Sequence, residues 1–300
     1  MRIGSRSELL SRARRPCTPR FWWRAAGRDA ITLAVMLNAP AGTGGSDLCV
    51  PLAYLVFFTP RSGSYLLCSE LQASNVAGRP GEWFSPTTAS SRGAAQQGAI
   101  RRLANVVGDT ATANGVVGAK TTRFHYESFS ECLSSELGGA DLDLLDALSV
   151  VGAEVRLVWL RRRDKARQAV SYWRASVTGE WSLRPGQAPG GVESSRFDVE
   201  HAARLEERIV TDERWIAQLL ARSQLPHTIV WYEDLAAHPR SVTDSVLTFL
   251  GVQTPSRDHQ PRFSRQSDAT SESLVERYVS WRTSRLTSPE GGRRTPGPSP

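Results

Sequence analysis

The chain has 300 residues, enough for one large α/β domain with a sizeable core. Its formal net charge of +7 suggests nucleic-acid binding, but residues 1–28 hold eight arginines and one acid, Glu8, and so carry the whole excess. The remainder is close to neutral, so we expect no nucleic-acid partner for the folded part. The four cysteines lie far apart, without CxxC spacing or a nearby histidine. We therefore expect no metal site and no disulfide framework, but reduced thiols in a cytoplasmic protein.

Residues 1–50 form an arginine-rich extension that we predict to be disordered. They imitate an export signal, because arginines precede an apolar run at residues 30–37 and small residues follow it. That run is short and begins directly after Asp29, which favours an extension or a misplaced start codon over a signal. The chain has no run of about 18 apolar residues, so no transmembrane segment is expected.

The first clear element is an apolar, β-rich run over residues 53–58, which predicts a buried strand. The chain then passes through the loop TPRSGS, residues 59–64, into an apolar helix over residues 66–74. A strand, a tight turn and a helix N-terminus together form an anion site, because backbone N–H groups and the helix dipole point into the turn.

The side chains of this loop suit phosphate or sulfate. Arg61 adds a permanent charge, and Ser62 and Ser64 add hydroxyl donors. The loop lacks the spacing and the lysine of the GxxxxGK[ST] pattern, so a nucleoside triphosphate is not its expected ligand. The simpler alternative is an ordinary turn in which Ser64 caps the helix.

Later in the chain, strand-like and helical runs alternate. Further strands are predicted at residues 115–118, 154–160 and 227–232, and helices at residues 142–149, 165–177, 205–220 and 241–250. This alternation favours a parallel sheet wrapped by helices, in one domain over residues 51–287 that binds ligands at the carboxyl ends of its strands. Residues 181–195, rich in Gly and Pro, predict a long loop or a mobile lid, and residues 288–300 a disordered tail.

A second anion site is indicated after the strand at residues 154–160. Three arginines, residues 161–163, follow that strand, and Asp164 is a suitable N-cap for the next helix. Ser171 lies about two turns into this helix, and its side chain leans back toward the helix N-terminus. One arginine and Ser171 can therefore converge on one anion. The alternative is three solvated arginines and a serine tolerated within a helix.

These two sites resemble those of sulfotransferases that use PAPS, 3′-phosphoadenosine-5′-phosphosulfate. The TxRSGSxxL run resembles their 5′-phosphosulfate loop, and a strand followed by Arg-x₇/₈-Ser is their 3′-phosphate site. Both Arg162 and Arg163 fit that spacing to Ser171, and we favour Arg162. The runs SGSYLL…VAGRPGEWF, QAVSYWRA and RQSD…VERY are similar to the bacterial trehalose 2-sulfotransferase (Stf0-type) family. The resemblance extends from Tyr54 to about Trp281.

The resemblance implies a P-loop-like sulfotransferase fold that moves a sulfuryl group from PAPS to a hydroxyl of a trehalose-like sugar or glycolipid precursor. PAP is then the product, no metal is required, and a homodimer is implied. The donor-binding residues that it implies are Thr59, Arg61, Ser62, Gly63, Ser64, Tyr65, Arg162, Ser171 and Arg265.

The same family places its catalytic base at the position of Glu82 and a lysine at the position of Lys120. Arg61 and Lys120 would stabilise the transferring group, and Glu82 would take the proton of the acceptor hydroxyl. Many other sulfotransferases have a histidine base two residues after such a lysine, where this chain has Thr122. His125 is the fallback base, and the alternative for Glu82 is a loop carboxylate paired with Arg79.

The acceptor and the type of activity stay open at this stage. Arg79 stands where the trehalose enzyme has an acidic residue, which leaves the acceptor open. A phosphoryl transferase on the same fold and a non-catalytic PAP or PAPS sensor are the alternatives to the sulfotransferase. Glu233 and Asp234, in a segment shared widely among sulfotransferases, are expected to cap or pair structurally.

Overall fold

The computed structural model describes residues 50–86, 98–152, 154–182, 194–253 and 269–287. Its centre is one parallel sheet with the strand order β2-β1-β3-β4. The strands are β1 (Leu52–Phe58), β2 (Val116–Thr121), β3 (Val155–Arg161) and β4 (His227–Trp231). All four strands confirm the sequence prediction, although β2 extends three residues further than expected. That extension carries Lys120 at the carboxyl end of the sheet.

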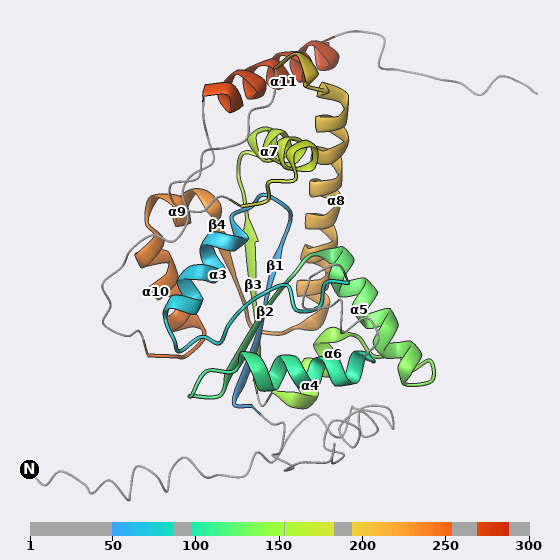
Figure 1. Cartoon of the computed structure of the whole chain (residues 1–300), viewed down its shortest axis with the longest axis vertical. Helices are drawn as coiled ribbons and strands as arrows, with labels where there is room; N and C mark the ends of the chain where they lie inside the picture. Colours follow the sequence, from blue (N-terminus) through green and yellow to red (C-terminus); the bar gives the residue numbers. More distant parts are fainter. Residues whose placement is uncertain (1–49, 87–97, 153, 183–193, 254–268, 288–300) are drawn as a thin grey trace, which may run out of the picture.

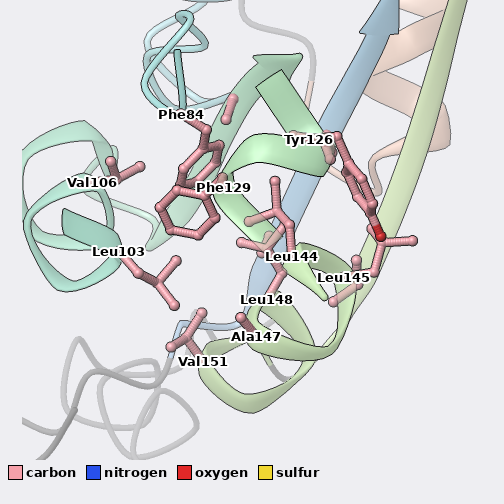
Figure 2. Close-up of a cluster of buried hydrophobic side chains, with 14 of the residues drawn as sticks. Phe84, Leu103, Val106, Tyr126, Phe129, Leu144, Leu145, Ala147, Leu148 and Val151 are labelled. Carbon is pink, nitrogen blue, oxygen red and sulfur yellow. The ribbon is translucent and has the colours of Figure 1, made fainter. Parts of the chain in front are cut away.

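Strand β1 is buried along its whole length because helices cover both faces of the sheet. On one face, Leu55 and Phe57 pack against the C-terminal half of α8 and against three shorter helices. The helices of this face are α4 (Ala99–Thr110), α5 (Arg123–Glu136), α6 (Leu144–Val151) and α8 (Val199–Ser223). Figure 2 shows part of this core, in which Phe84 lies beside Phe129, with 4.7 Å between ring centroids.

On the other face, Tyr54 and Val56 pack against three helices that lie together on the opposite side of the sheet (Figure 1). These helices are α3 (Ser64–Ala73), α9 (Tyr232–Ala237) and α10 (Pro239–Phe249). The hydroxyl of Tyr54 donates to the carbonyl of Ala77 at 2.7 Å, so the chain after α3 is tied back to the central strand.

A third group of helices lies beyond the carboxyl ends of the strands (Figure 1). It consists of α7 (Lys165–Thr178), the N-terminal half of α8 and α11 (Ala269–Thr287), with a 3₁₀ turn at Ser194–Arg196. Trp173 of α7 is fully buried and meets Phe197 edge-on, with 4.7 Å between ring centroids. This group forms a wall above the sheet edge where the ligand was expected.

Some predictions fall on residues outside the described ranges. They are the extension at 1–49, most of the 181–195 loop, Arg265 and the tail from 288. The domain limits therefore stay predictions. Among the described helices, none combines the length and the apolar character needed to span a bilayer.

Candidate active site

A cleft of about 1240 Å³ opens at the carboxyl ends of β1 and β3. The chain leaves these two neighbouring strands in different directions, since the next strand after β1 lies on one side of it and β3 lies on the other. Ligands of open α/β sheets bind at such a switch point. Seven of the predicted site residues line the cleft, namely Arg61, Gly63, Ser64, Tyr65, Glu82, Arg162 and Ser171.

The loop between β1 and α3 is shaped for an anion. Gly63 adopts a φ of 91° at the N-cap of α3, and Arg61 adopts a φ of 65°. The N-cap of this helix is Gly63 and its first residue is Ser64, and no side chain within the described residues caps it. The alternative in which Ser64 caps the helix is therefore wrong. The Oγ of Ser62 is buried and has no hydrogen-bond partner in the described part of the chain. An unpartnered buried hydroxyl beside a helix N-terminus fits a bound anion.

Arg61 joins this loop to helix α7. Its Nε donates to the Oγ of Ser171 at 2.9 Å, and its Nη1 donates to the carbonyl of Trp181. Burial, and then the nearby charge of Arg162, lower the pKa of Arg61 to about 10. Arg61 therefore stays charged at neutral pH. Because its charge is poorly solvated there, a bound anion would stabilise it.

Of the three arginines after β3, the structure favours Arg162 as the anion ligand. The guanidinium of Arg161 donates to Glu213 at 2.9 Å, and that of Arg163 makes a two-pronged pair with Asp234 at 2.7 and 2.8 Å. Arg162 instead donates from Nη1 to the carbonyl of Arg61 at 3.2 Å.

Arg162 has no carboxylate partner among the described residues. Its guanidinium lies 4.7 Å from the ring centre of Tyr232, its Nε is buried without a partner there, and burial lowers its pKa. The structural roles expected for Asp234 and Glu233 are confirmed. Asp234 pairs with Arg163, and Glu233 accepts hydrogen bonds from the backbone N–H groups of Arg163 and Asp164.

Glu82 and Lys120 meet at the edge of the cleft. The Nζ of Lys120 lies 2.9 Å from Glu82 Oε1 and donates to the Oγ of Ser64 at 3.4 Å. The Glu82 side chain therefore pairs with Lys120 rather than with Arg79, and the alternative from the sequence is wrong. Lys120 is 3% exposed and lies beneath the ring of Tyr65, 3.6 Å from its centre.

The loop that carries Glu82 is fixed on both sides. The backbone N–H of Lys120 donates to the carbonyl of Gly81 at 2.8 Å, and Phe84 is anchored in the core of Figure 2. Gln72 of α3 donates to the carbonyl of Pro80 at 2.8 Å. These contacts hold the carboxylate next to the loop that follows β1.

The model of one protein family, described as Stf0 sulphotransferase, matches residues 53–280. This chain belongs to the Stf0 sulfotransferase family. It is therefore a sulfotransferase-family enzyme on an α/β fold, as the sequence predicted. The match covers β2, β3, β4, all of β1 except Leu52, and both anion loops.

Curated relatives of this Stf0 protein carry a substrate in their names. It is 31% identical to the trehalose 2-sulfotransferase of Mycolicibacterium smegmatis, over 76% of this chain and 94% of that protein. It is 27% identical to the trehalose 2-sulfotransferase of Mycobacterium tuberculosis, over 75% and 93%. Among solved structures, a sulfotransferase from Alicyclobacillus acidocaldarius aligns with a TM-score of 0.41 and 14% identity, over 78% of this chain and 93% of that one.

The Stf0 family implies PAPS as the sulfuryl donor, and the residues present fit its two phosphate groups. Ser62 has an unpartnered buried hydroxyl, and Arg61 and Arg162 are buried cations that the described residues do not neutralise with a carboxylate at ion-pair distance. No cluster of three or more metal-ligating side chains occurs in the described ranges. Thr59 lies beneath the loop, where its Oγ1 accepts from Gln168, and Arg265 lies outside the described residues.

Three further residues of the cleft lining, Phe124, Trp181 and Asp212, were missed by the sequence analysis. Phe124 and Trp181 are 53% and 44% exposed and line the cleft, as do His125 and Asp212. The pKa of His125 is lowered, chiefly by burial, so its imidazole is neutral at pH 7, and its Nδ1 is buried without a partner in the described part. Exposed aromatic faces beside polar groups in a cleft are typical of a binding site. The signal in the sequence was the pair Phe124-His125, four and five residues after the predicted Lys120.

Proposed function

We propose that this Stf0 sulfotransferase moves a sulfuryl group from PAPS to a hydroxyl of a trehalose-like carbohydrate. The observation that carries the proposal is the 2.9 Å contact between Arg61 Nε and Ser171 Oγ. It brings together two loops that the sequence assigns to two phosphate groups of one nucleotide. A ligand with phosphates at both ends of its ribose fits such a double site.

In the donor half, the helix N-terminus at Gly63 and Ser64 and the guanidinium of Arg61 would hold the 5′-phosphosulfate. Arg162 and Ser171 would hold the 3′-phosphate. Helix N-termini and planar guanidinium groups both suit tetrahedral anions. PAPS supplies the sulfuryl group, and the residues of the chain supply its orientation.

In the chemical step, Glu82 would take the proton of the acceptor hydroxyl. The acceptor oxygen then forms a bond to sulfur, while the bond between sulfur and the phosphate oxygen breaks and PAP is released. Lys120 and Arg61 would stabilise the negative charge that develops on the transferring group and on the leaving phosphate. Lys120 also orients Glu82, because the two side chains are 2.9 Å apart.

A carbohydrate acceptor is supported by the relatives and by aromatic and acidic residues of the cleft lining. Both curated relatives are named as trehalose 2-sulfotransferases. Asp212, a half-buried carboxylate, and the exposed rings of Phe124 and Trp181 offer the hydrogen-bond acceptors and flat apolar faces that sugars need. Arg79 is exposed and is not among the described residues that line the cleft, so its charge is no obstacle to a neutral sugar.

The test is sulfuryl transfer from radiolabelled PAPS, without added metal, to a panel that includes trehalose, other disaccharides and glycolipids. We expect a labelled disaccharide and the release of PAP. Tight binding of PAP with no product from any acceptor would favour the non-catalytic sensor. Phosphoryl transfer from ATP with Mg²⁺, and none from PAPS, would contradict the proposal in favour of a kinase-like enzyme.

A further inference from the structure

Beneath the two anion loops lies a buried polar network that the proposed mechanism does not use. Its centre is Gln168 in the second turn of α7, which is 0% exposed. The Nε2 of Gln168 donates to the Oγ1 of Thr59 at 2.9 Å and to the carbonyl of Pro60 at 2.8 Å. A side chain from the second loop's helix therefore holds the backbone of the first loop.

Lys165 extends this network toward Arg162. Its Nζ contacts the carbonyl of Arg162, the carboxylate of Glu213 and, at 3.5 Å, the Oε1 of Gln168. An ammonium group has three donors, and each has an acceptor here. Lys165 thus connects the backbone of Arg162 to the side-chain amide of Gln168, which in turn donates to the carbonyl of Pro60. The chain has only two lysines, and each contacts one of the anion loops, Lys120 at the Oγ of Ser64 and Lys165 at the carbonyl of Arg162.

Glu213 of α8 anchors the network in the core. It is 5% exposed, and its second oxygen accepts from Arg161 at 2.9 Å. One carboxylate thus faces two cations, Arg161 and Lys165, and the group keeps a net positive charge beneath the anion sites. The guanidinium of Arg161 also lies 4.2 Å from the ring centre of Trp159, so it is fixed by packing as well as by charge.

The contacts close into a ring. Arg162 Nη1 donates to the carbonyl of Arg61, and the network returns from the carbonyl of Pro60 through Gln168 and Lys165 to the carbonyl of Arg162. Within this ring, both amide hydrogens of Gln168 and all three donors of Lys165 have acceptors, and such buried hydrogen-bonded networks are rigid. The ring passes through one backbone segment of each anion loop, so it fixes the spacing between them.

We propose that Gln168, Lys165 and Glu213 are positioning residues that hold the two phosphate-binding loops at the spacing of a 3′,5′-bisphosphate. The proposal rests on the proposed function, in which one nucleotide spans both loops. A ligand with two anchored ends gains affinity over either end alone only if the two sites are held at the matching distance. The network supplies that distance.

The test compares three ligands by isothermal titration: PAP, 5′-AMP and 3′-AMP. We expect the wild-type protein to bind PAP at least about 100-fold more tightly than either monophosphate. Gln168→Met removes both donors at nearly constant volume, and we expect it to weaken PAP binding by about tenfold or more, yet to weaken each monophosphate by about twofold. A merely structural role would weaken all three ligands by the same factor.

The matched control is Gln72→Met. It removes the same kind of bond, from a glutamine amide to a proline carbonyl at 2.8 Å, but in the loop of Glu82. We expect it to leave the ratio between PAP and monophosphate affinities unchanged. Lys165→Met, in which Glu213 keeps Arg161 as a partner, is the second variant and should lower the same ratio if Gln168→Met does not fold.

Two results would overturn the proposal, and they are distinguishable. The positioning role alone is removed if the wild type prefers PAP and both Gln168→Met and Lys165→Met keep the ratio of PAP to monophosphate affinity. The same conclusion follows if these variants weaken the binding of all three ligands by the same factor. A wild-type protein that binds PAP no more tightly than 5′-AMP removes the proposed donor site together with this inference.

Discussion

The ring of Tyr232 lies directly against the backbone of Gly63, so that a Cβ on this glycine would stand 2.5 Å from Tyr232 Cδ2. The guanidinium of Arg162 also lies near that ring, 4.7 Å from its centre. Tyr232 of α9 therefore lies between the two anion loops and fixes how closely they approach. From the sequence, Tyr232 was expected only to end a strand. The structure shows that it also lines the cleft.

Gly63→Ala tests this relationship. The substitution meets both the steric conflict with Tyr232 and a φ of 91° that an L-residue resists. We expect the free energy of unfolding to fall by about 1–3 kcal/mol and PAP affinity to fall at least about tenfold. The control is Gly138→Ala, which has a φ of 74° with open space around it, so it carries the backbone strain alone. Equal PAP affinity in both variants would contradict the account of the loop.

Arg162 and Arg163 form a second matched pair, because they are adjacent and differ in their partners. Arg162→Gln should weaken PAP binding by about 10- to 100-fold, the loss of one or two hydrogen bonds to a charged group. Arg163→Gln should leave PAP affinity unchanged, since its side chain is committed to Asp234 outside the anion site. Titration calorimetry with PAP measures both. The reverse order of the two effects would show that the 3′-phosphate site is misassigned.

Lys120→Met removes the ammonium group but keeps most of the apolar stem. We expect kcat to fall by about 100-fold, because a buried positive charge next to the transferring group is lost. PAP affinity should change much less, since PAP lacks the sulfuryl group that Lys120 would serve. Steady-state transfer from PAPS gives kcat, and single-turnover transfer gives the rate constant of the chemical step. An unchanged kcat would exclude Lys120 from the chemical step.

His125 provides a prediction on pH. Burial lowers its folded-state pKa below the ordinary value of 6.5, so the unfolded state takes up the proton first as the pH falls. The stabilising contribution of neutral His125 is therefore complete above pH 6.5 and is lost as the pH falls from there toward the folded pKa. We expect His125→Gln to reduce the slope of unfolding free energy against pH in that window, measured by urea titration. The same replacement at exposed His227 is the control.

The strands and the anion loops could be predicted from the sequence, because long apolar runs and the RSGS turn are local signals. Helices α4 and α5 were not predicted. In α5, residues of modest helix propensity such as Ser, Phe and His dominate, and the helix is stabilised by the burial of Tyr126, Phe129 and Leu133. In α4, the apolar residues Ile100, Leu103 and Val107 recur at helical spacing, so the signal was present.

The choice among the three arginines after β3 could not be made from spacing. It depends on which carboxylates neutralise the other two, and these come from Glu213 and Asp234, 52 and 71 residues away. The pairing of Glu82 with Lys120 likewise depends on the register of β2 against β1, which places Lys120 opposite Val56 at the carboxyl edge. Tertiary contacts of this kind have no local signal.

The most direct test of the account is the transfer of labelled sulfuryl from PAPS to trehalose by the wild type and by Glu82→Gln, with PAP affinity measured on the same samples. The substitution keeps the shape of the side chain but removes its ability to take a proton, so we expect turnover to fall by about 10²- to 10⁴-fold. PAP affinity should be unchanged, and Glu127→Gln, which breaks only the ion pair with Arg123 on α5, should transfer at the wild-type rate. Turnover by Glu82→Gln at the wild-type rate would contradict the account.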